Sequence, residues 1–349
     1  MGEAQQGCQY QGRLIAGACR FRWRDDVKLA RRNFLSLAAG AAALPIASRY
    51  ACAEAYPARA VHVLVGFSPG SASDVIVRLM AQRLSEQLGQ PFVVENRVGA
   101  ATNLAAEQVA RATADGYTLL LATSTNAVNS TLYRNLNFNF STDIAPVALI
   151  DLVPYVLEVT PSLPAKTLPE FIAYAKANPG KINYASVGSG AATNVAGELF
   201  KAMAGVDLTN VPYKSSYLPD LLSGQVQASF TPIAQTVNFI KTGKLRAIAV
   251  TGETPSEALP GVPTAAEVVP GYNAYVWDAI GAPAKTPPDI IAQLNKTINA
   301  LLAEPAIKTR FTELGAEPMI MTPAEFGKYM AEETEKWGKV VKFAHIKPD

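Results

Sequence analysis

Short apolar runs that alternate with amphipathic helical patterns constrain the fold of this chain more than any other feature. Val61–Phe67 has the length and apolar character of a buried strand, and Asp74–Leu88 follows with apolar residues at helical spacing. The same order recurs in "DGYTLLLATS", in "KINYASVGSG" and in the segments up to Val250. Strands separated by helices of this length favour α/β sheets with parallel strands. The ~290 residues after Ala55 favour two lobes over a single sheet.

Composition and charge exclude two classes of protein. The chain is 49% hydrophobic and 17% charged, as in globular proteins that bury a large core. Its formal net charge of +2 comes from a basic segment at residues 1–55, and the remainder is slightly acidic. We therefore expect no binding of nucleic acid. No apolar stretch is long enough to predict a membrane-spanning helix.

Residues 1–55 have the organisation of a leader with an export signal. Arg31 and Arg32 form a twin-arginine pattern, and the apolar stretch Phe34–Ala47 follows it. This stretch is shorter than the ~20 residues of a stable membrane span. Small residues then define cleavage before Glu54 or Tyr56. We expect a cleaved N-terminal signal peptide and a periplasmic mature chain, with the Tat and Sec routes both open.

The cysteines and the start of the chain fit the same prediction. Cys8, Cys19 and Cys52 all lie in the leader, so the mature chain would contain no cysteine and no disulfide. The polar residues 1–26 are unusual before a signal peptide, and we expect translation to begin at Val27.

A loop after the first predicted strand fits the G-x-S-x-G spacing of a hydrolase. In Gly66-Phe67-Ser68-Pro69-Gly70, Ser68 would be the nucleophile, and His345 lies downstream as that fold requires. However, the oxyanion hole uses the backbone N–H of the residue after the nucleophile, and Pro69 has none. Loss of one such donor costs ~3–4 kcal/mol of transition-state stabilisation. A serine esterase is therefore a remote alternative.

Other catalytic chemistry has little support in the sequence. The predicted mature chain has two histidines, His62 and His345, and no cysteine, so a metal site of nitrogen and sulfur ligands is not indicated. No glycine-rich phosphate-binding motif follows a predicted strand. We expect no catalytic residue, no metal and no cofactor.

Two loops have the features of anion-binding helix starts. Ser71 and Asp74 have capping-box spacing, and the N–H groups of a first helical turn attract a carboxylate. The loop Ser186–Asn194 offers the same small residues and hydroxyls before a helix. Either loop alone is as consistent with a simple tight connection between a strand and a helix.

A set of ordered blocks resembles a known family, the periplasmic substrate-binding proteins of tripartite tricarboxylate transporters, or Bug-type receptors. The resemblance covers Tyr56–Asp349 and rests on "YPARAVHVLVGFSPGSASD", "LGQPFVVENRVGAATN", "ADGYTLLLATS", "FIAYAKANPGKINYAS", "AGELFKAMAGVDLTNVPYK", "GKLRAIAVTG", "LPGVPTAAEVVPGY" and "EETEKWGKVVKFAHIKPD". It implies an α/β periplasmic-binding-protein fold of type II, in which two Rossmann-like lobes enclose a ligand cleft. Residues 56–157 and 280–349 would form lobe 1 and residues 158–279 lobe 2, with two hinge crossovers near Val156–Thr160 and Asp278–Gly281.

The resemblance also implies a set of ligand contacts. On the first loop these are Phe67, Ser68, Gly70, Ser71, Ala72, Ser73 and Asp74. On the second loop they are Ser186, Gly188, Ser189, Gly190, Ala191, Ala192, Thr193 and Asn194, with Thr123, Ser124 and Tyr213 bordering the site. For Phe67 and Tyr213, core packing is an equal alternative.

Three departures from the family pattern put the ligand's identity in doubt, although not the mode of binding. Relatives often have two adjacent glycines where this chain has Gly70-Ser71, a histidine at Asn194, and an acidic residue at Thr231-Pro232. We expect a monomeric, non-enzymatic receptor that binds a small organic acid and delivers it to a membrane permease. A sensor that passes the bound state to a signalling partner is the alternative.

Overall fold

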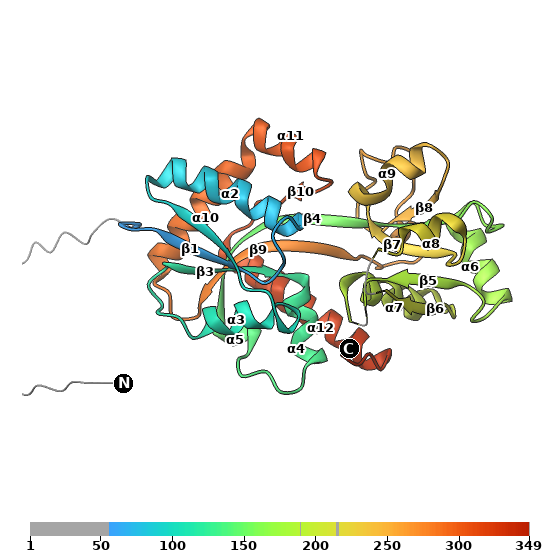
Figure 1. Ribbon diagram of the computed structural model, residues 1–349, viewed down its shortest axis with the longest axis horizontal. Coiled ribbons are helices and arrows are strands. Elements are labelled where there is room, and N and C mark those ends of the chain that lie inside the picture. Colours follow the sequence, from blue (N-terminus) through green and yellow to red (C-terminus); the bar gives the residue numbers. More distant parts are fainter. Residues whose placement is uncertain (1–55, 189, 214–215, 349) are drawn as a thin grey trace, which may run out of the picture. The chain divides into compact units, whose positions relative to one another are not determined.

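The computed structural model describes residues 56–188, 190–213 and 216–348 (Figure 1). Ala55–Asp349 form one compact unit. The leader, its twin arginines, its cysteines and its cleavage sites lie outside the described residues, and so does Ser189.

The strands form two sheets that share β4. The first sheet has the order β2-β1-β3-β9-β4, with bounds Phe92–Asn96, Val61–Val65, Thr118–Thr123, Tyr275–Pro283 and Ile144–Val159, and β10 (Glu317–Pro318) also pairs with β4. The second sheet has the order β4-β7-β5-β6, where β7, β5 and β6 are Ala228–Pro232, Asn183–Ser186 and Thr209–Pro212, and β8 (Arg246–Val250) pairs with β4. Along β4, Pro154 is paired with β9 and Tyr155 with β7. One continuous strand therefore joins the two sheets.

The strand directions place the ends of the two sheets toward each other. β1 and β3 are parallel, and β3 and β4 are both antiparallel to β9, so β1, β3 and β4 run the same way. β7 is antiparallel to β4 and parallel to β5. Because β4 runs from the first sheet into the second, the carboxyl ends of β1 and β3 point toward the second sheet. Those of β5 and β7 point toward the first.

Helices cover both faces of the first sheet (Figure 1). One face packs against α2, α10 and α11, which are Ala72–Leu88, Pro288–Ala303 and Pro305–Glu313. The other face packs against α3, α4, α5 and α12, which are Asn103–Ala110, Ser124–Leu132, Phe140–Asp143 and Pro323–Phe343. The alternation of side chains along β1 explains this, since Val61, Val63 and Val65 belong to the first core and Leu64 to the second.

The second sheet is also covered on both faces. Buried aromatic residues of the sheet pack against α6 (Leu168–Ala177) and α7 (Ala192–Ala204), among them Tyr184 and Phe230. α8 (Leu218–Ser223) and α9 (Ile233–Lys241) bury smaller apolar clusters elsewhere on this sheet. The short helices η1 (Ala100–Thr102) and η2 (Ala265–Glu267) lie in connections. Among the helices that the structure describes, none combines the length and apolar character needed to cross a membrane.

The fold class predicted from the sequence, a two-lobed α/β fold, is confirmed, but the sheets are mixed rather than parallel. The central strands β9 and β4 run antiparallel to each other, and β7 runs antiparallel to β4. The sequence pattern missed this because it predicted no strand at β4 or at β9, the two strands whose pairing makes the sheets antiparallel at the centre. The lobe boundaries at residues 157 and 280 stay predictions.

Candidate functional site

The first predicted loop ends β1 and begins α2 through a tight turn at Gly70. Gly70 has a φ of +81°, and its N–H donates to Asp74 Oδ2 at 2.9 Å. Ser71 is the N-cap, and its hydroxyl accepts from Asp74 N at 3.3 Å. Ser68 and Ala72 are exposed, so the turn faces solvent.

Asp74 organises this turn and directs its carboxylate into the protein. Arg78 Nε donates to Oδ2 at 2.9 Å, and Asn96 Nδ2 donates to Oδ1 at 2.7 Å. Burial disfavours the charged form, but the hydrogen bonds from Arg78, Gly70 and Asn96 outweigh it and lower the pKa of Asp74. Its two oxygens are therefore occupied by the chain itself. The structure places Asp74 behind the predicted ligand loop.

The second loop repeats this arrangement at the start of α7. Gly190 has a φ of +77°, and its N–H donates to Asn194 Oδ1 at 3.0 Å. Ala191 is the N-cap residue, with backbone angles that match those of Ser71. Asn194 Nδ2 donates to the hydroxyl of Tyr184 at 3.0 Å. Like Asp74, the buried Asn194 shapes its turn from behind.

Each turn leaves amides of the first helical turn available. In the described part of the chain, the backbone N–H groups of Ala72 and Ser73 donate to no residue, and neither do those of Ala192 and Thr193. Each pair lies at the positive end of a helix dipole, where an anion is favoured. Since β1 and β5 point toward each other's sheet, these two pairs lie at facing ends.

The remaining predicted residues divide into accessible and buried groups. Val187, which the prediction omitted, is 53% exposed and lies beside the half-buried Gly188 on the second loop. Ser186 is fully buried and exchanges hydrogen bonds with Asn210. Thr123 and Ser124 are 1% exposed, so in this structure they support the site and present no surface to it. Phe67 is half-buried and packs against the core.

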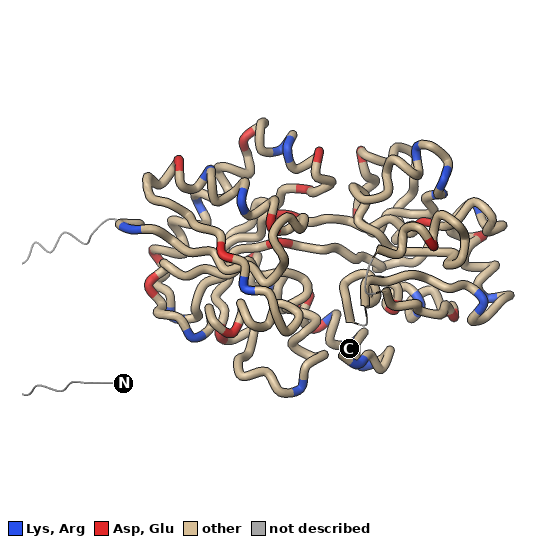
Figure 2. Tube along the Cα trace, in the orientation of Figure 1, with Lys and Arg blue, Asp and Glu red and all other residues tan. Residues whose placement is uncertain are grey.

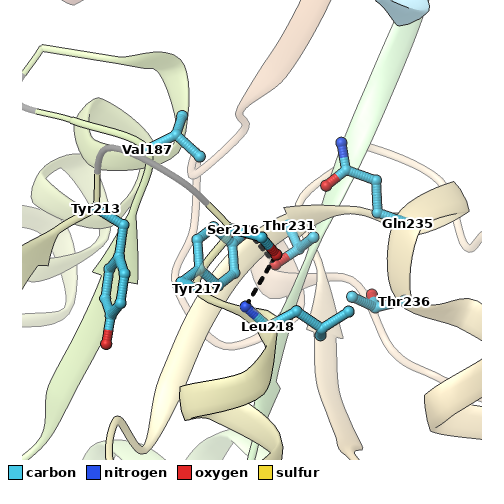
Figure 3. Close-up of a pocket in the computed structure, with 8 residues that line it drawn as sticks. All are labelled: Val187, Tyr213, Ser216, Tyr217, Leu218, Thr231, Gln235 and Thr236. Carbon is cyan, nitrogen blue, oxygen red and sulfur yellow. Dashed lines mark hydrogen bonds between the residues drawn. The ribbon is translucent and has the colours of Figure 1, made fainter.

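A pocket of about 270 Å³ opens beside the second loop (Figure 3). It contains one residue of that loop, Val187, and one other predicted residue, Tyr213, whose hydroxyl points away and donates to Asp220 Oδ2 at 2.7 Å. Sequence reasoning missed the other lining residues, Ser216, Tyr217, Leu218, Thr231, Gln235 and Thr236. The only signal in the sequence that pointed to this part of the pocket was the departure from the family pattern at Thr231-Pro232.

Two buried carboxyl groups lie beside the first loop, and sequence reasoning missed both. Asp151 on β4 and Asp278 on β9 face each other in register, and Asp278 N donates to Asp151 Oδ1 at 3.1 Å. Burial raises the pKa of Asp278 to about 7, although a hydrogen bond from Ser73 opposes the shift. Burial and the charge of Asp278 raise the pKa of Asp151 well above its usual range. Nothing in the local pattern of an apolar strand predicts such a pair.

Ser68 has no catalytic partners in the described residues. Its hydroxyl contacts no histidine or acid there, and His62 instead pairs through Nδ1 with Glu95 Oε1 at 2.6 Å. Figure 2 shows acidic and basic residues interspersed along the described chain.

Paired turns at the facing ends of two α/β sheets joined by β4 are typical of periplasmic solute-binding proteins. Comparisons with known proteins identify the family. The model of the tripartite tricarboxylate transporter family receptor matches residues 76–346. Protein BugT of Bordetella pertussis is 37% identical over 295 residues, which cover 83% of this chain and 90% of BugT.

Solved structures agree with this assignment. A protein of R. palustris solved with adipate is 38% identical, covers 84% of this chain and all of its own, and gives a TM-score of 0.72. MatC of Rhodopseudomonas palustris with bound malate is 32% identical, covers 82% of this chain and all of its own, and gives a TM-score of 0.68.

This chain belongs to the tripartite tricarboxylate transporter receptor family, as the resemblance predicted. It is a periplasmic solute-binding receptor of that family. Because the family consists of binding proteins, the prediction of a receptor rather than an enzyme is also confirmed.

Proposed function

We propose that this receptor binds a small organic anion through a carboxylate held between the two loops, and delivers it to the membrane permease of its transporter. The observation that carries the proposal is the pair of equivalent helix starts, Gly70–Asp74 and Gly190–Asn194. Each fixes its turn with an inward hydrogen bond from glycine and leaves two amides unpaired within the described chain.

Backbone amides at two helix ends suit a carboxylate. Each helix N-terminus carries a partial positive charge, and hydrogen bonds from fixed N–H groups need no reorganisation when the ligand arrives. Closure of the two sheets over the ligand would remove water and strengthen these interactions. Relatives solved with adipate and with malate support a carboxylate ligand here.

The hinge that allows this closure would lie where β4 changes partner, between Pro154 and Tyr155. The second connection, between β8 and β9, is tied to the same point. Tyr155 N donates to Thr251 Oγ1 at 2.8 Å, and that hydroxyl donates to Ala274 O at 2.6 Å. The predicted crossovers at Val156–Thr160 and Asp278–Gly281, and the predicted lobes of residues 56–157 with 280–349 and of residues 158–279, lie a few residues beyond these points, because Val156 already pairs with β7 and Asp278 with β3 and β4. The leader at residues 1–55 would direct export and be removed.

Proline at the first position of each helix tests the amides directly. Ala72→Pro and Ala192→Pro each delete one N–H, and proline is favoured at this helical position. The chain already uses it there in α11 and α12, which begin at Pro305 and Pro323. We expect each variant to keep its melting temperature within a few degrees and to weaken carboxylate binding about tenfold, as for one charge-assisted hydrogen bond.

The controls are Ala72→Ser and Ala192→Ser, which keep the amide. Binding is measured by calorimetry and by thermal shift over mono-, di- and tricarboxylates, because a ligand at a hundredfold excess over Kd adds ~2.7 kcal/mol of stability. The proposal is wrong if no carboxylate stabilises the protein. It is also wrong if both proline variants fold and bind carboxylates as tightly as the unmodified chain.

A further inference from the structure

The pocket beside the second loop is adjacent to the proposed carboxylate site. Val187 lines the pocket and belongs to the loop that begins α7, and Tyr213 N donates to Ser186 O at 2.8 Å in the same loop. A ligand whose carboxylate meets the amides of Ala192 and Thr193 can therefore extend into this pocket. The chemistry of the pocket wall decides which distal group it accepts.

A chain of hydroxyl groups runs from the pocket wall into the protein. The hydroxyls of Tyr217 and Thr231 are 2.8 Å apart, those of Thr231 and Ser229 are 2.8 Å apart, and Ser229 donates to Glu158 Oε1 at 2.9 Å. Each hydroxyl has one proton to donate. Because Ser229 gives its proton to Glu158, it must accept from Thr231, and Thr231 must accept from Tyr217.

The direction of this chain determines what the wall offers to a ligand. All three protons point inward to Glu158, so Tyr217 and Thr231 have only lone pairs left for a group in the pocket. Lone pairs accept hydrogen bonds from O–H and N–H groups and repel a carboxylate, which has no proton to give. Glu158 is itself fully buried behind the wall.

A second observation comes from Thr236, at the other side of this wall. Its side chain lines the pocket and is 1% exposed, and its Oγ1 makes no hydrogen bond of ordinary geometry among the described residues, although it lies close enough to Glu158 to help lower the pKa of that carboxyl. A buried hydroxyl without a partner is costly, and native proteins rarely leave one unless a ligand or water completes it. Figure 3 shows Thr236 and Thr231 among the side chains that surround the pocket.

We infer that the pocket is a specificity subsite for a hydrogen-bond donor, so that the receptor prefers a carboxylate whose far end carries a hydroxyl or amino group over a dicarboxylate. The inference rests on the proposed function, because it places the ligand's carboxylate at the two loops. The donor of the ligand supplies the hydrogen bond that Thr236 Oγ1 lacks, and Thr231 is the acceptor beside it.

A matched ligand series tests this with the full chain. At each length from propionate to heptanoate, four endings are compared: methyl, hydroxyl, ammonium and carboxylate. We expect the hydroxyl or the ammonium ending to bind about tenfold more tightly than methyl at the best length, as one hydrogen bond gives, and more tightly than carboxylate. The hydroxyl and ammonium arms show whether the donor is neutral or cationic.

Thr236→Val and Thr236→Ser are the paired variants. Valine keeps the shape and removes an unpartnered hydroxyl, so the melting temperature of the ligand-free protein should not fall. We expect valine to abolish the donor preference without changing the affinity for methyl endings, and serine to restore it.

The outcomes separate this inference from the proposed function. Tighter binding of dicarboxylates at every length, or a donor preference that survives Thr236→Val, would overturn the donor subsite and leave carboxylate binding intact. If no member of the series binds at any length, the proposed function fails first.

Discussion

Replacing Asp278 with asparagine should stabilise this receptor at neutral and alkaline pH. Asp278 is 1% exposed and Asp151 is fully buried, and one oxygen of each carboxyl has no partner among the described residues. When two buried carboxyls face each other in this way, ionising both of them costs free energy because their charges repel. An asparagine at position 278 would keep an oxygen toward Ser73 and offer an N–H to Asp151.

The size of the effect follows from the pKa of Asp278. Burial raises that pKa to about 7, whereas an unfolded aspartate titrates near 3.9. Because the folded state holds the proton more tightly, the group's contribution to stability declines as pH rises from about 4 to about 7 and is constant above. The difference of about three pH units corresponds to about 4 kcal/mol at 1.36 kcal/mol each. Removing this cost should raise the melting temperature at pH 8 by on the order of 10 °C.

Thermal unfolding followed by circular dichroism between pH 4.5 and 8.5, at constant ionic strength, measures this. The unmodified protein should lose stability across that range, and Asp278→Asn should lose less, because only Asp151 then keeps a raised pKa. Asp289→Asn, which removes an exposed acid at the start of α10, is the control and should keep the original pH profile. An Asp278→Asn profile parallel to that of the unmodified protein, or a lower melting temperature at pH 8, would refute the reasoning.

Three further predictions concern other parts of the chain. Glu158→Gln should raise the melting temperature at pH 8 but not at pH 5, because burial raises the pKa of Glu158 to about 7, and the same unfolding experiment measures it. Asp74→Asn, which gives the first loop the asparagine of the second, should lower the free energy of unfolding in denaturant by about 1 kcal/mol. Asp74→Ala should lower it by about 3 kcal/mol, because alanine also leaves the N–H of Gly70 unpaired. Gly70→Ala should cost only the ~1–2 kcal/mol of a left-handed backbone, because an added Cβ meets nothing there. Gly190→Ala should cost more, because its Cβ would also displace the end of the Leu132 side chain. Equal losses in urea titrations would contradict this.

Helical periodicity predicted most of the outer layers of the fold. The helix predicted at Asp74–Leu88 begins two residues earlier in the structure, at Ala72, and ends at the predicted residue. The central strand β4 could not be predicted in this way. It is buried along most of its length, so it shows no alternation, and it contains Pro146 and Pro154, which normally argue against a central strand. A register shift between Pro146 and Ala148 accommodates the first of these prolines.

The candidate site was predictable where it depends on local turn chemistry and not where it depends on tertiary contacts. Glycine followed by small residues and a helix identified both loops, which the structure places at facing ends of the two sheets. The pocket wall is different, because Glu158, Ser229 and Thr231 come from two strands that pair only in the folded chain. No spacing in the sequence connects residue 158 to residues 229–236. The family resemblance drew attention to Thr231 only because this residue departs from the family pattern.

The pentapeptide GAATN shows why local sequence is not sufficient even for the loops. It occurs at residues 99–103 and 190–194. In the second copy glycine alone has a positive φ and the helix starts at once, whereas in the first copy Ala100, Ala101 and Thr102 all do. Three such residues cost ~1–2 kcal/mol each. Something outside the pentapeptide must offset that cost.

The contacts that stabilise the first copy come from α4 and from the end of β1. Asn126 Nδ2 donates to Thr102 Oγ1 at 3.0 Å, and Asn129 Nδ2 donates to Ala101 O at 2.6 Å. Thr102 in turn fills the space beside Gly66, where an added Cβ would lie 2.5 Å from that of Thr102. Gly66 immediately precedes the loop that we propose for the carboxylate. A strained turn is therefore held against the base of the binding loop by tertiary hydrogen bonds, and it gives that loop a rigid support that the same five residues do not form at position 190.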